Sequence, residues 1–91
     1  MPEIQLVIMG KVQGVCFRAE AQEKAQELGL TGWVKNQGDG SVLCVAQGPE
    51  GALDQLIEWS KKGPERANVE HVEIIRTKNP HTLYRDFEII F

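Results

Sequence analysis

A strand, a loop with two glycines and a helix follow one another in residues 4–28, which read IQLVIMGKVQGVCFRAEAQEKAQEL. The mainly apolar run Ile4–Met9 predicts a strand buried on both faces. Over Phe17–Leu28, apolar side chains recur at helical spacing and charged ones occupy the opposite face, which predicts an amphipathic helix. Gly10 and Gly14 interrupt both patterns, so we expect an irregular loop between the two elements.

Glycine, proline and asparagine residues divide the rest of the chain into five further elements. The segments between these turn residues are either β-branched and aromatic or follow helical spacing. We expect strands at Thr31–Lys35 and Ser41–Gln47, a helix between Pro49 and Gly63, and strands at Val69–Thr77 and Leu83–Ile90.

This order of elements is β-α-β-β-α-β with one more strand at the C-terminus. It predicts an α+β fold of the ferredoxin-like, split β-α-β type, in which an antiparallel sheet carries two helices on one face. Right-handed crossovers make the first two strands parallel and place the third strand between them. The C-terminal ends of the first two strands then share one edge of the sheet, which brings Gly10–Arg18 close to Asn36.

Length, composition and charge limit the possible functions. The 91 residues are 42% hydrophobic and 25% charged, and we expect one globular domain over residues 1–91. Ten basic and 13 acidic residues give a net charge of −3, which argues against a nucleic-acid partner. No apolar run approaches the roughly 20 residues that span a bilayer, and the N-terminus lacks a secretion signal. We therefore expect a cytoplasmic protein without a membrane partner.

The two cysteines and two histidines form no recognisable metal motif. Cys16 and Cys44 are distant in sequence, lack a CxxC arrangement and are expected to be reduced, partly buried side chains. A disulfide or a reactive thiol stays open as an alternative. We expect His71 and His81 to be exposed or edge-strand residues rather than acid–base or metal-binding groups.

The segment from Gly10 to Arg18 has the features of an anion site. The first N–H groups of a helix have no partner within the helix, and the helix dipole is positive at that end. Gly14 permits close approach of a phosphate, and the forked guanidinium of Arg18 suits two oxygens of one phosphate. The segment matches neither GxxxxGK[ST] nor GxGxxG. From these residues alone, a tight turn beside a surface arginine is an equally weighted alternative.

Two motifs resemble those of the acylphosphatase family. Gly10-Lys11-Val12-Gln13-Gly14-Val15-Cys16-Phe17-Arg18 resembles the family's pattern G-x-V-Q-G-V-x-[F/Y]-R. Gly32-Trp33-Val34-Lys35-Asn36, followed by Gly40, Val42 and Gly48, is similar to its second pattern, G-aromatic-x-x-N-x-x-x-G-x-V-x-x-x-x-x-G. The two motifs occur in the right order and spacing, and the resemblance covers nearly the whole chain.

The resemblance implies an enzyme that hydrolyses acyl phosphates to a carboxylate and inorganic phosphate without a metal or cofactor. It implies that Arg18 binds the phosphate and that Asn36 orients the attacking water. The phosphate-binding loop that it implies consists of Gln13, Gly14, Val15, Cys16, Phe17 and Arg18. We expect a monomer, competition by phosphate or sulfate, and a free-standing enzyme rather than the N-terminal domain of a larger carbamoyl-transferring protein.

The same residues also allow other interpretations. Without the second motif, Asn36 is an ordinary residue before a glycine-rich turn. RNA-binding modules with this fold need aromatic residues on the central strands, and Ile4–Met9 and Ser41–Gln47 have none. An anion-sensing module without turnover stays open. If the last strand returns to this edge, the Phe91 carboxylate would be placed to pair with Arg18; the sequence leaves this contact open.

Overall fold

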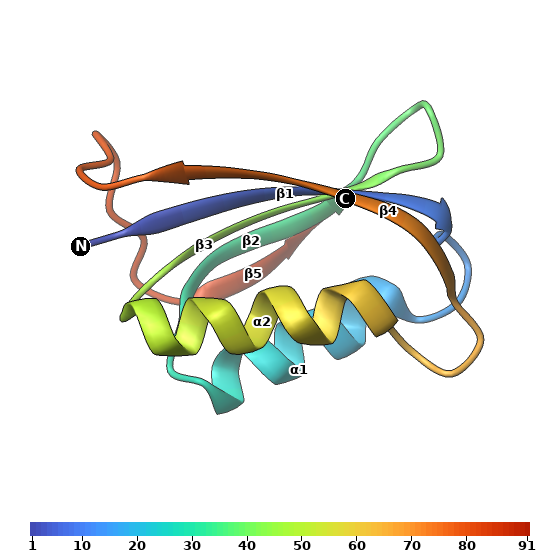
Figure 1. Cartoon of the computed structure of the whole chain (residues 1–91), viewed down its shortest axis with the longest axis horizontal. Coiled ribbons are helices and arrows are strands. Elements are labelled where there is room, and N and C mark those ends of the chain that lie inside the picture. Colours follow the sequence, from blue (N-terminus) through green and yellow to red (C-terminus); the bar gives the residue numbers. More distant parts are fainter.

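Seven elements follow one another along the computed structural model, which describes residues 1–91 (Figure 1). They are β1 (Glu3–Lys11), α1 (Phe17–Glu27), β2 (Thr31–Asn36), β3 (Val42–Gln47), α2 (Glu50–Lys62), β4 (Asn68–Thr77) and β5 (Phe87–Ile90). The predicted element order is confirmed. The main difference is at residues 83–86, which precede β5 instead of forming its first half, because the buried side chain of Gln47 hydrogen-bonds the backbone of Thr82 and Tyr84.

The strands form one sheet in the order β4-β1-β3-β2-β5. As predicted, β3 lies between β1 and β2 and pairs with both in antiparallel fashion, so β1 and β2 run in the same direction. The prediction of an antiparallel sheet is wrong at one edge, because β5 pairs with β2 in parallel. The chain leaves β4 at one edge, crosses to the other and reverses its direction relative to β4, which aligns β5 with β2.

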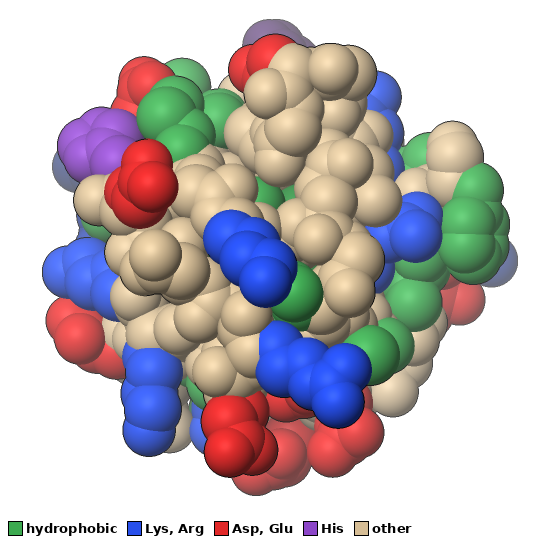
Figure 2. All heavy atoms as spheres, turned by 90° about the vertical axis from the view of Figure 1, so that its right-hand side faces the viewer, with side chains coloured by type: hydrophobic (Ala, Val, Ile, Leu, Met, Phe, Trp, Pro, Cys, Tyr) green, Lys and Arg blue, Asp and Glu red, His purple; other side chains and the backbone are tan.

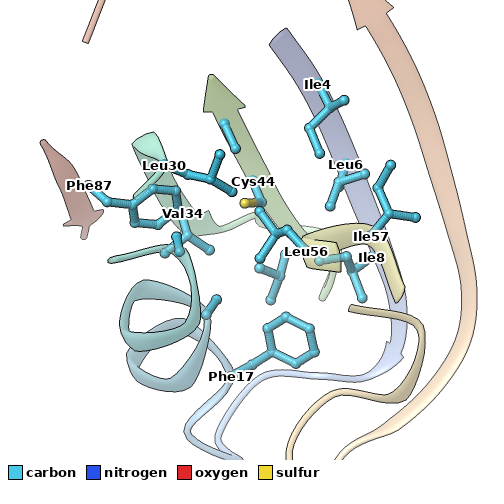
Figure 3. Packing of buried hydrophobic residues seen from close by; sticks show 14 of the residues in the cluster. Ile4, Leu6, Ile8, Phe17, Leu30, Val34, Cys44, Leu56, Ile57 and Phe87 are labelled. Atoms are coloured by element: carbon cyan, nitrogen blue, oxygen red, sulfur yellow. The ribbon is translucent and has the colours of Figure 1, made fainter. Parts of the chain in front are cut away.

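Both helices cover the same face of the sheet, and the hydrophobic core lies between these two layers (Figures 1 and 3). The burial pattern of β1 alternates: Ile4, Leu6 and Ile8 are buried, whereas the intervening side chains are only partly so. The prediction that β1 is buried on both faces is therefore wrong. A strand covered by helices on one side needs apolar residues only at every second position.

Phe17 anchors the start of α1 in this core. Its side chain is 2% exposed and points into the core (Figure 3). Its ring is tilted by 60° against that of Trp59, with centroids 5.3 Å apart. Burying a side chain of this size contributes about 1.5–3 kcal/mol. Phe17 thus lies on the buried face of the predicted amphipathic helix, and its burial fixes the neighbouring Arg18 relative to the sheet.

Three chain segments meet at one end of the molecule, on the right of Figure 1. They are the loop that follows β1, the turn that follows β2, and Phe91, which follows β5. They meet there because β1, β2 and β5 all run in the same direction, as the strand pairing requires. The prediction that Gly10–Arg18 and Asn36 share one edge of the sheet is confirmed.

Candidate active site

The loop between β1 and α1 has an unusual backbone conformation. Gly14 (φ 75°) and Cys16 (φ 64°) are both left-handed, and the side chain of Val15 between them is buried. Alternation of left-handed with ordinary residues turns successive N–H groups toward one side and forms a concave anion-binding arrangement. Cys16 holds this conformation without being glycine, which costs on the order of 1 kcal/mol and is typical of functional sites.

The N–H groups of this loop and of the first turn of α1 are not used within the chain. None of the N–H groups of residues 13–19 donates to a backbone carbonyl, and Cys16, at the N-cap of α1, makes no side-chain capping bond. These groups also carry the positive end of the helix dipole. They are therefore free donors for an anion.

Arg18 lies in the first turn of α1 and contacts the end of β5. One of its Nη atoms is 3.5 Å from the carbonyl oxygen of Ile90, and its Cζ lies 4.9 Å from the centre of the Phe91 ring. The ion pairs of the protein involve Lys24, Lys61 and Arg76, and Arg18 is in none of them. The last strand returns to this edge, but the contact with Arg18 is made by a carbonyl oxygen and an aromatic face instead of the Phe91 carboxylate.

Asn36 reaches the same place from a different strand. It is the last residue of β2, half-buried, and its ladder partner on β3 is Val42. The side-chain hydrogen bonds at this turn come from Gln13, Gln37 and Ser41, and none involves the Asn36 carboxamide. An unengaged amide can both donate and accept a hydrogen bond.

A cavity of about 300 Å³ joins these groups. It is lined by Val12, Gly14, Cys16, Phe17, Arg18, Ala19, Asn36, Ile89 and Phe91. Two residues of the predicted loop point elsewhere: the side chain of Val15 is in the core, and that of Gln13 hydrogen-bonds the β2–β3 turn. Sequence reasoning missed Val12, Ala19 and Ile89. Ile89 reaches the cavity because it pairs in parallel with Val34, and no sequence motif indicates that pairing.

This end of the molecule carries its own charge pattern despite the net charge of −3. Figure 2 looks onto it and shows basic side chains near the middle of the face, among uncharged groups, and further basic and acidic side chains together along its edges. A local positive region of this kind attracts small anions even on a weakly acidic protein.

The prediction that both cysteines are partly buried is wrong, because one is fully buried and the other is exposed. Cys44 is in the core, where burial raises the pKa of its thiol to about 12, whereas Cys16 is exposed; both thiols are free. His71 on β4 and His81 in the β4–β5 connection are exposed. No group of three or more His, Cys, Asp or Glu residues is arranged to hold a metal ion. Neither helix has the length and apolar character needed to cross a membrane.

Comparison with known proteins assigns the chain to a family. The sequence model of the acylphosphatase family matches residues 4–89. The chain belongs to the acylphosphatase family. The acylphosphatase of Acaryochloris marina is 45% identical over 93 residues, which cover 99% of this chain and 98% of the relative.

Solved structures agree with this assignment. The crystal structure of acylphosphatase from Bacillus subtilis is similar with a TM-score of 0.95 at 34% identity, over 100% of both chains. HypF from T. kodakarensis is similar with a TM-score of 0.85 at 32% identity, over 99% of this chain but 12% of the HypF chain. An acylphosphatase-like fold thus also occurs as a small part of a larger protein.

The first glycine of each acylphosphatase motif is required because a side chain there would collide with a neighbouring strand. A Cβ atom on Gly10 would lie 2.2 Å from the carbonyl oxygen of Asn68 on β4, and one on Gly32 would lie 1.9 Å from that of Val45 on β3. The pairing of β1 with β4 also shifts in register between Met9 and Gly10. Gly10 allows β1 to approach β4 closely beside the loop, and Gly32 allows β2 to approach β3 closely near the start of β2.

Proposed function

We propose that this chain is an acylphosphatase in which Arg18 and the loop N–H groups bind the phosphate and Asn36 orients water. The observation that carries the proposal is the shared cavity, where the free donors of one strand–helix junction face an unengaged carboxamide from another strand. In the reaction, water attacks phosphorus, the bond between phosphorus and the acyl oxygen breaks, and a carboxylate and inorganic phosphate are released.

The phosphate site is built mainly from fixed donors. Phosphoryl transfer needs positioning and charge stabilisation more than covalent help, because negative charge is spread over three equatorial oxygens. Backbone N–H groups at a helix N-terminus supply oriented dipoles, and the guanidinium of Arg18 adds a permanent charge with two parallel donors. The contacts of Arg18 with Ile90 and Phe91 support a preorganised guanidinium that need not be rearranged on binding.

Asn36 serves as a positioning group for water in this scheme. Its carboxamide oxygen accepts a hydrogen bond from the water and thereby fixes the line of attack. An amide is not a general base, and Cys16 and Arg18 are the only ionisable side chains that line the cavity. We therefore infer that the proton of the water passes to the substrate's own phosphate oxygens. The leaving carboxylate is a stable anion at neutral pH and requires no acid.

Several finer properties belong to the same proposal. Inorganic phosphate and sulfate compete with substrate, because they present the same oxygens to the same donors. Residues 1–91 act as a single domain and as a monomer, and no metal ion takes part. The expectation of a cytoplasmic location stays a prediction.

The test is hydrolysis of benzoyl phosphate by the wild-type chain, followed by loss of ultraviolet absorbance with and without EDTA. We expect rapid turnover that EDTA leaves unchanged and that inorganic phosphate inhibits competitively. A folded chain that binds phosphate without turning over benzoyl phosphate would contradict the proposal and favour an anion-sensing module. Loss of activity in EDTA, restored by a divalent cation, would contradict the metal-independent scheme.

A further inference from the structure

The side chain of Gln13 leaves the anion-binding loop and crosses to the β2–β3 turn. Its Nε2 donates to the carbonyl oxygen of Gln37 at 2.8 Å and to that of Ser41 at 3.0 Å. Both bonds are partly buried, and they join positions 24 and 28 residues apart in sequence. The two protons of one carboxamide are therefore both used to hold the loop to the hairpin.

The carbonyl groups of Gln37 and Ser41 lie directly beyond Asn36 in the hairpin. Asn36 and Val42 are the last pair of the β2–β3 ladder, and the N–H of Gln37 donates to the carbonyl of Ser41 at 2.8 Å in the next position. Gln13 thus binds both sides of the turn, at the first pair of residues past Asn36 and Val42.

The rest of the turn is held by its own side chains. The carboxylate of Asp39 accepts hydrogen bonds from the N–H and the hydroxyl of Ser41, and the hydroxyl of Ser41 also accepts one from Nε2 of Gln37. These bonds hold the turn together from within, and the bonds from Gln13 connect it to the loop.

We propose that Gln13 is a positioning residue that sets the placement of Asn36 relative to the bound phosphate. This inference rests on the proposed function, since it concerns the relation between the two halves of that site. Arg18 and the free N–H groups bind the phosphate without help from the Gln13 carboxamide. The attacking water is fixed from the other side of the cavity, and the Gln13 bonds connect the two sides.

The test compares Gln13→Met with the wild type in two constants, kcat for benzoyl phosphate and the inhibition constant of inorganic phosphate. Methionine has a similar length but no donor, so both bonds are lost. A displacement of about 1 Å in a reacting group costs up to about 100-fold in rate, and we expect kcat to fall by roughly 10- to 100-fold. The phosphate inhibition constant should stay within about 2-fold of wild type, because its donors are unchanged.

Gln47→Met is the matched control. Gln47 is 1% exposed, hydrogen-bonds Glu3, Thr82 and Tyr84, and lies at the opposite end of β3 from the turn. Its replacement removes buried hydrogen bonds and lowers the free energy of unfolding at least as much as Gln13→Met. We expect it to leave kcat unchanged, so a loss of kcat that follows stability alone would appear in both variants.

Two results would overturn the proposal. The first is an unchanged kcat in Gln13→Met. The second is a parallel loss of kcat and phosphate affinity, because Gln13 would then only support the anion-binding loop. If Gln13→Met does not fold, Gln13→Asn, which retains the amide but is one methylene shorter, is judged by the same criteria.

Amide hydrogen exchange separates this proposal from the proposed function. If the wild type lacks turnover, the proposed function fails, and exchange at the N–H of Gln37 still tests the link between loop and hairpin. Faster exchange there in the Gln13 variant than in Gln47→Met would support the link, and equal exchange would overturn it.

Discussion

The two phenylalanines beside Arg18 provide a quantitative test of how the site is supported. Phe17 is 2% exposed and packs on Trp59, whereas Phe91 is 96% exposed and lies over the guanidinium. Phe17→Ala should cost about 3–5 kcal/mol through lost burial and the cavity left behind. The total stability of a small domain is only about 5–15 kcal/mol, so the variant should lose a large share of it.

The measurement is urea denaturation followed by far-ultraviolet circular dichroism, with Phe91→Ala as the matched control. With an m-value of about 1–1.5 kcal/mol/M, Phe17→Ala should lower the urea midpoint by roughly 2–5 M. Phe91→Ala should cost at most about 1 kcal/mol, because it loses only an exposed cation–π contact. Similar midpoint shifts in the two variants would refute the conclusion that Phe17 is the core anchor of α1 and that Phe91 is a surface contact.

Two further predictions concern other groups near the site. A thiol reagent should modify only Cys16 in the native protein, because Cys44 is buried and the pKa of its thiol is raised to about 12. Saturating inorganic phosphate should slow the modification of Cys16. Rapid modification of two thiols would contradict the assignment. The hydrogen bonds from Ser41 lower the pKa of Asp39 below its ordinary value of 3.8, so its stabilising effect is present above that pH and is lost as the pH falls through the lowered pKa. Asp39→Asn should therefore destabilise the protein at pH 7, with a difference from wild type that shrinks below about pH 4; a difference independent of pH, measured by urea denaturation, would contradict this.

Much of the site could be predicted from the sequence because local signals coincide with it. The helix begins at Phe17 as the apolar spacing predicts, and right-handed crossover of β1 and β2 brings Arg18 and Asn36 together. The left-handed conformation of Cys16 had no such signal, because a cysteine gives no preference for positive φ. Tertiary context imposes it there.

Long-range contacts account for the rest of what the sequence did not reveal. The parallel pairing of β5 depends on how residues 78–86 cross the sheet, and the sequence predicts a strand from Leu83 in place of the second half of this connection. Gln13 could be predicted to form hydrogen bonds in a loop, but not to bind carbonyl groups 24 and 28 residues away. The face of the Phe91 ring on Arg18 likewise follows from the packing of β5 beside β2.

The central claim is that one side of the cavity binds the phosphate and the other side orients the water. The most direct test measures kcat for benzoyl phosphate and the inhibition constant of phosphate in Arg18→Ala and Asn36→Ala. We predict that Arg18→Ala weakens phosphate binding and lowers kcat by about 100-fold or more. Asn36→Ala should lower kcat to a similar extent while phosphate binds as in the wild type. Retention of wild-type kcat in Asn36→Ala, or of wild-type phosphate affinity in Arg18→Ala, would contradict this division of roles.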